Sequence, residues 1–86
     1  MGQLQQLPNI GQEMERQLHA IGIETAEQLR QMGSKQAWLA IQAIDPSACY
    51  NRLCGLEGAV QNVRYHHLPD EVKQDLKAFY LAHKLQ

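Results

Sequence analysis

The stretch of sequence that decides the fold is residues 7–33, which read LPNIGQEMERQLHAIGIETAEQLRQMG. It contains three glycines at intervals of eleven residues, Gly11, Gly22 and Gly33. Between the first two, Met14, Leu18 and Ile21 recur at the spacing of one helix face. Gly22 is placed to take the left-handed conformation that ends a helix. The pattern therefore predicts a short helix from Gln12 to the second glycine.

A second short helix is predicted between Gly22 and Gly33. It begins with a capping box, in which the Thr25 side chain accepts from the backbone and Gln28 reaches back to it. A third helix is expected from Ser34 or Lys35 to Ile44.

Asp45 and Pro46 predict the start of a fourth helix, because aspartate caps free backbone donors and proline suits the first helical position. An apolar stripe follows at helical spacing, made of Cys49, Leu53, Leu56 and Val60. Gly55 and Gly58 interrupt it, and we expect another backbone to approach there. After a polar connection from Gln61 to Leu68, a final helix begins at Pro69-Asp70-Glu71. Its expected inner face is Val72, Leu76, Phe79, Tyr80 and His83.

The chain is expected to be all-α, a compact bundle of about five short helices, because no segment alternates with the period of a strand. Its 86 residues leave room for a single domain, residues 1–86, and exclude a two-domain enzyme. The formal net charge of -1 gives no general attraction to nucleic acid or anionic membranes. No membrane span and no signal peptide are apparent, so a cytoplasmic location is expected.

The chemistry-bearing residues form no recognisable catalytic or metal motif. Cys49 and Cys54 are too few for a disulfide framework, and with His66 and His67 they lack the usual spacing of zinc ligands. A nucleophilic cysteine would need a base and an oxyanion site, and the sequence shows neither. We therefore predict no enzyme activity, no cofactor and no metal.

Leu7-Pro8-Asn9-Ile10-Gly11, followed by a helix, looks like half of a helix-hairpin-helix unit. In such units residues that tolerate positive φ point backbone N–H groups at a nucleic-acid phosphate. The residues that would contact DNA here are Asn9, Ile10, Gly11, Gln12 and Arg16. Glu13 and Glu15 stand beside them and would repel phosphate. The hairpin is therefore either a weak phosphate clamp or a turn that only joins helices.

A family resemblance covers roughly residues 7–80. It rests on the paired Asn-Ile-Gly and Gly-Ile turns and on residues 49–59, which read CYNRLCGLEGA. These features resemble the C-terminal domain of the TfoX/Sxy family, bacterial regulators of natural competence whose full-length members promote transcription of DNA-uptake genes and also carry an N-terminal α/β domain. On this resemblance the chain is a stand-alone relative or a piece of a longer regulator.

The resemblance implies a helical, helix-hairpin-helix-like domain without catalysis. Together with the neutral charge, it favours a regulatory module that binds a protein partner in the control of DNA uptake. The alternative is a weak, sequence-independent DNA-binding module that uses the hairpin. The sequence identifies neither the partner nor the oligomeric state.

Overall fold

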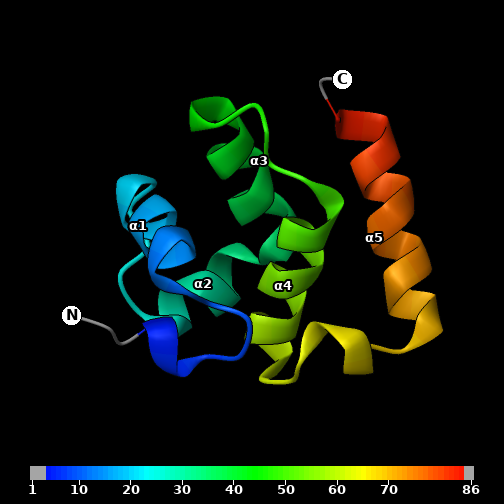
Figure 1. Ribbon diagram of the computed structural model, residues 1–86, viewed down its shortest axis with the longest axis horizontal. Coiled ribbons are helices and arrows are strands. Elements are labelled where there is room, and N and C mark those ends of the chain that lie inside the picture. The colour runs from blue at the N-terminus through cyan, green and yellow to red at the C-terminus, as the bar shows by residue number, and fades with distance from the viewer. Residues whose placement is uncertain (1–3, 85–86) are drawn as a thin grey trace.

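The computed structural model describes residues 4–84, which form five α-helices and two short 3-10 helices (Figure 1). The α-helices are α1 Gln12–Ala20, α2 Ala26–Met32, α3 Ser34–Ile44, α4 Tyr50–Gln61 and α5 Asp70–His83. The 3-10 helices are η1 Leu4–Gln6 and η2 Tyr65–His67. No strand occurs within the described range. The expectation of an all-α bundle of about five helices is confirmed.

Helix α4 occupies the centre of the bundle (Figure 1). It packs against α2, α3, α5 and η2, while α1 packs against α3 and η1. In Figure 1, α1 and α2 lie to one side of α4 and α5 lies to the other. Helices α3 and α4 both pack against α5 and so connect the first two helices to the last one.

Helix α1 ends in the way its glycine predicts. Gly22 has φ 93°, its N–H donates to His19 O, and the next N–H, of Ile23, donates to Leu18 O. These two bonds satisfy carbonyls that the helix end would leave free. Leu18 and Ile23, which both bracket the turn, are buried, so the chain direction at this turn is also fixed by core packing.

Helix α2 begins with the predicted capping box. The Thr25 side chain accepts from the Gln28 N–H at 3.1 Å, and the Gln28 side chain accepts from the Thr25 N–H at 3.2 Å. Gly33, at φ 85°, ends α2 and also precedes the first residue of α3, so one residue links the two helices.

The fourth helix does not begin at Asp45 and Pro46, so that prediction was wrong. Asp45 follows the last residue of α3, and its Oδ1 accepts from the N–H and the hydroxyl of Ser47 in a short turn. Helix α4 begins only at Tyr50. The residue before it, Cys49, accepts a hydrogen bond at its carbonyl from the Trp38 indole N–H at 3.1 Å. The side chain of a buried tryptophan on α3 therefore fixes the backbone just before α4.

The apolar stripe of α4 is confirmed in its middle and wrong at its first residue. Leu53 and Leu56 are fully buried, and Val60 is half-buried. Cys49 is exposed, because it lies before the helix, whereas Cys54 is buried. The stripe began one turn too early because the helix start was misplaced.

The close approach expected at the two glycines of α4 is present at Gly58 but not at Gly55. A Cβ at Gly58 would lie 2.6 Å from Val63 O and would also collide with the Asn9 side-chain amide. At Gly55 the same atom would lie 3.5 Å from the Asn9 Cβ, an ordinary contact. Gly58 is therefore required by the close approach, and Gly55 is not.

The core is built from nine fully buried large side chains: Trp38, Leu4, Leu18, Ile23, Leu29, Ile41, Leu53, Leu56 and Leu76. Trp38 contacts Phe79 and Tyr80 of α5 edge-on, with ring centroids 6.1 and 5.7 Å from its own.

Of the expected inner face of α5, Leu76 is buried, Val72, Phe79 and Tyr80 are half-buried, and His83 is exposed. The polar connection predicted from Gln61 to Leu68 contains the 3-10 helix η2. Within residues 4–84, no helix combines the length and apolar character that crossing a membrane requires.

Candidate functional site

The hairpin Leu7–Gly11 joins η1 to α1 through a turn with positive φ. Asn9 has φ 70°, and the Ile10 N–H donates to Leu7 O at 3.4 Å. Ile10 is buried and Gly11 precedes the first residue of α1 with an extended backbone. The sequence correctly identified Asn9 as a residue that tolerates positive φ.

The Asn9 side chain points into the molecule. Its Nδ2 donates to Val63 O at 3.0 Å and to Gly55 O at 3.4 Å, and its Oδ1 accepts from the Tyr65 N–H at 3.2 Å. These bonds attach the hairpin to the end of α4 and to η2. Asn9 therefore contributes a turn to the candidate site, while its side chain is fully used in holding the fold together.

Gln12 and Arg16 are exposed on α1. The Arg16 guanidinium donates to the Glu13 carboxylate and forms an ion pair with it, which lowers the pKa of Glu13. Arg16 therefore has its charge partly matched by a neighbour on its own helix, and both side chains remain largely in solvent.

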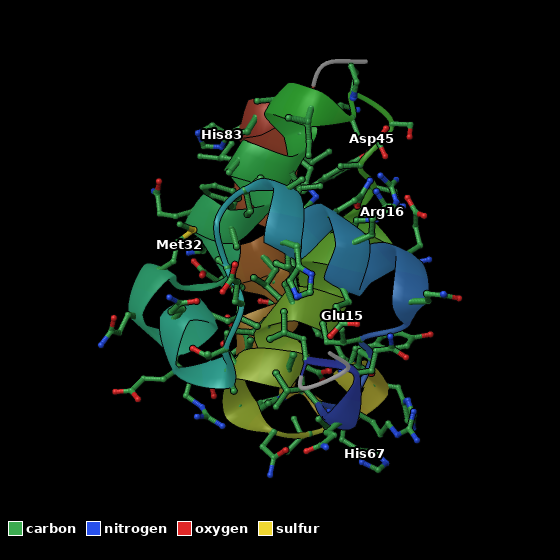
Figure 2. The ribbon with its side chains drawn as sticks, turned by 90° about the vertical axis from the view of Figure 1, so that its left-hand side faces the viewer. Glu15, Arg16, Met32, Asp45, His67 and His83 are labelled. Atoms are coloured by element: carbon green, nitrogen blue, oxygen red, sulfur yellow. The ribbon has the colours of Figure 1, made fainter. Side chains whose placement is uncertain are left out.

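Glu15 does not share that exposed face. It is buried, and its carboxylate accepts from the Leu4 N–H at 3.2 Å and from the Gln5 side-chain amide at 2.6 Å. These hydrogen bonds, the Gln5 bond foremost, lower its pKa. The Glu15 carboxylate therefore holds η1 against α1 (Figure 2). That it repels phosphate from the hairpin stays a prediction.

Arg64 lies beside the hairpin and was missed from the sequence. An open pocket of about 470 Å³ is lined by the hairpin and η1 together with this one residue from beyond α4: Gln5, Gln6, Leu7, Pro8, Asn9, Ile10, Gly11 and Arg64. No local signal could have placed Arg64 there. The contact depends on the Asn9 bonds that bring residues 63–65 against the hairpin.

The two cysteines and the adjacent histidines are not brought together. Cys49 is exposed before α4, Cys54 is buried, and burial raises the pKa of the Cys54 thiol. His66 and His67 are exposed on η2, with their rings 4.4 Å apart. Across residues 4–84, no three side chains of the metal-binding types gather where they could hold an ion.

A second concave region lies between the α2–α3 junction, α4 and the first half of α5, and we call it the α3–α5 groove. Its volume is about 580 Å³. The residues that line it are Met32, Gly33, Ser34, Lys35, Gln36, Glu57, Glu71, Val72, Asp75 and Leu76. None of them lines the hairpin pocket. In Figure 2, Met32 of the groove lies on the left of the view and Arg16, beside the hairpin, lies on the right, so the groove and the hairpin are separate surfaces.

The groove combines apolar and acidic side chains. Val72 and Leu76 come from α5 at helical spacing, and Met32 remains 40% exposed at the end of α2. Glu57, Glu71 and Asp75 supply three carboxylates and Lys35 supplies one ammonium group. The region was not identified from the sequence, because its members come from three separate stretches of the chain.

Comparison with known proteins gives the family. The model of the TfoX C-terminal domain matches residues 1–80. The chain belongs to the TfoX C-terminal domain family. The resemblance stated from the sequence is confirmed, and it extends over the hairpin, the capping box and the glycines of α4. No curated protein matches the chain significantly.

Two solved structures share the fold of this TfoX C-terminal domain. One is an uncharacterized protein from Listeria monocytogenes in a triclinic crystal form, with a TM-score of 0.91 and 44% identity over 92% of this chain and 90% of that one. The other is a protein of unknown function from Listeria monocytogenes in a tetragonal form, with a TM-score of 0.90 and 44% identity over 92% and 96% of the two chains. Neither description states an activity.

Proposed function

We propose that this TfoX C-terminal domain is a non-enzymatic regulatory module that acts through protein-protein contacts in the transcriptional control of DNA uptake. Membership of the family supports the regulatory role. The observation that supports a protein contact is the α3–α5 groove, a recess where Met32 is exposed near the half-buried Val72 and three carboxylates. A recess that offers apolar side chains within a polar rim can receive apolar side chains of a partner protein.

The test is made in the bacterium that encodes the chain. The gene is deleted and restored, and transcripts of DNA-uptake genes are measured. We expect them to fall on deletion and to recover on restoration. A photoreactive amino acid is then placed at Gln36, in the groove, and at Gln12, on α1, as a matched exposed control. The groove position should cross-link to a component of the transcription apparatus. Unchanged transcripts after deletion would refute the regulatory role.

A second candidate, weak sequence-independent DNA binding, is favoured by the position of Arg64. It adds a second exposed cation to the hairpin surface, next to the free backbone donors of the first turn of α1. Backbone N–H groups at a helix start together with arginine are suited to a phosphate. The Arg16–Glu13 pair opposes this role, because a carboxylate already matches that charge.

Fluorescence anisotropy with a labelled duplex separates the two candidates. We expect an affinity no tighter than about 10⁻⁴ M at physiological salt, because few phosphates would be neutralised. Glu13→Lys should produce salt-sensitive binding, since Glu13 is exposed and the fold does not depend on it. Micromolar binding by the unaltered chain, lost in Arg64→Ala and Arg16→Ala, would reverse the ranking.

A further inference from the structure

The α3–α5 groove carries information about the kind of partner it fits. We propose that it binds a basic amphipathic α-helical segment of a partner protein, with apolar side chains on its floor and lysine or arginine along its acidic edge. This inference rests on the proposed protein-binding function and specifies its site and partner. It follows from the shape of the floor and from the charges around it.

The floor is suited to one face of a helix. Val72 is half-buried on α5, one turn before the buried Leu76, and Met32 is 40% exposed at the end of α2, so Val72 and Met32 supply the apolar surface of the floor. Recognition of a helix in a groove uses apolar anchors that recur every three or four residues. Methionine also suits such a site, because its flexible side chain adapts to differently shaped partners.

The single cation of the groove is already matched. Lys35 Nζ lies 2.5 Å from the Asp75 carboxylate and 5.5 Å from the centre of the Phe79 ring. Within residues 4–84, neither Glu57 nor Glu71 belongs to an ion pair. The groove therefore keeps a formal net charge of minus two after its internal pair is counted.

The Glu57 carboxylate is held in place by neutral donors. The Ser34 hydroxyl donates to Oε1 and the Gln61 side-chain amide donates to Oε2, each at 2.5 Å. Hydrogen bonds from uncharged groups orient this carboxylate and leave its negative charge in place. Glu57 is only half-exposed, so its field in the groove is screened less than that of a fully solvated group.

Glu71, whose carboxylate forms no ion pair within the described residues, lies on the edge of the groove. Glu71 is exposed on α5, four residues before the Asp75 that pairs with Lys35. A cation of a partner helix can therefore meet Glu71 at the edge while another meets Glu57. An acidic partner, or a nucleic acid, would be repelled by these carboxylates.

The experiment uses two synthetic helical peptides with identical leucine positions, one with lysine and the other with glutamate on the polar face. Each is titrated into the ¹⁵N-labelled chain, and amide shifts are mapped by NMR. We expect the lysine peptide to shift residues 32–36 and 71–76, with binding that weakens as salt is raised. The glutamate peptide should leave these residues unshifted. Equal binding of both peptides, no binding of the lysine peptide, or shifts centred elsewhere would overturn the proposal.

Charge reversals supply the matched controls. Glu71→Lys should weaken the lysine peptide about tenfold, whereas Glu24→Lys, the same change in the α1–α2 turn, should leave its affinity within about twofold. Met32→Ser should also weaken it. Equal effects of the two reversals would show that only net charge matters and would refute the groove.

The cross-linking experiment in cells distinguishes failure of the groove from failure of the proposed function. If Gln36 gives no cross-link, other positions on the chain do, and transcription still depends on the gene, then the groove proposal fails while the regulatory function stands.

Discussion

At the scale of single residues, Asn9 is the one polar side chain of the hairpin Leu7–Gly11, and it connects the hairpin to distant parts of the chain. It makes hydrogen bonds to residues 46, 54 and 56 positions away in sequence. Its positive φ was predictable, because asparagine tolerates that conformation. Its partners were not, because a sequence pattern shows local geometry and does not show which distant carbonyls will lie within reach. The position of Arg64 beside the hairpin depends on the same long-range bonds.

The two glycines of α4 give a matched test at this scale. Gly55→Ala should be neutral or stabilise the chain by up to about 1 kcal/mol, because alanine is the better helix former and its Cβ fits. Gly58→Ala should destabilise by about 1–3 kcal/mol, since its Cβ would overlap Val63 O and the Asn9 amide. Urea denaturation monitored by circular dichroism measures both. Equal effects of the two substitutions would contradict the close approach at Gly58.

At the scale of helices, local signals located the starts of α2 and α5 but failed for α4, whose start is decided by tertiary contacts. The capping box at Thr25 and the acidic first turn of α5 act within a few residues, and both helices were predicted correctly. Asp45 and Pro46 carry the same kind of signal, but the Asp45 carboxylate is taken up by Ser47, Gln17 and Arg52. An aspartate before a proline therefore predicts a turn as readily as a helix.

The apolar stripe of α4 can be tested residue by residue. Leu53→Ala and Leu56→Ala should each destabilise by about 2–5 kcal/mol, because both side chains are fully buried in the central helix. Val60→Ala, on the same stripe but half-buried, should cost clearly less. Denaturant midpoints at neutral pH provide the comparison. A leucine variant with an unchanged midpoint would place that side chain on the surface of the folded chain.

At the scale of the whole molecule, the sequence predicted the family, most of the helices and the hairpin, but neither the α3–α5 groove nor the position of Arg64 beside the hairpin. The α3–α5 groove combines the end of α2 and the start of α3 with residues of α4 and α5. The hairpin pocket combines residues 5–11 with Arg64. Such surfaces depend on how helices are placed relative to one another, which helical periodicity does not determine. Lys35 illustrates the point, since its partner Asp75 lies 40 residues away.

One polar network joins the N-terminal half to the centre of the bundle. The Asp45 carboxylate accepts from Gln17 of α1 at 2.7 Å and from Arg52 of α4 at 3.0 Å, and Arg52 also donates to Gln17 at 2.9 Å. Hydrogen bonds from Ser47, then Gln17 and Arg52, hold the pKa of Asp45 well below its ordinary value of 3.8. Because the ionised form is favoured in the folded state, the network links stability to pH.

The direction of that dependence follows from proton binding. Below about pH 4 the unfolded chain binds a proton at Asp45 before the folded chain does, so the stabilisation present above that pH is lost as the pH falls toward the folded pKa. We expect the urea midpoint of the unaltered chain to fall between about pH 5 and pH 3. Asp45→Asn should be less stable at pH 7 and should lose less on acidification, the remainder arising from Glu13 and Glu15, whose pKa values are also lowered. If Asp45→Asn and the unaltered chain lost stability in parallel over this range, the acid sensitivity would have to reside in those two glutamates, and the network would only hold the helices together.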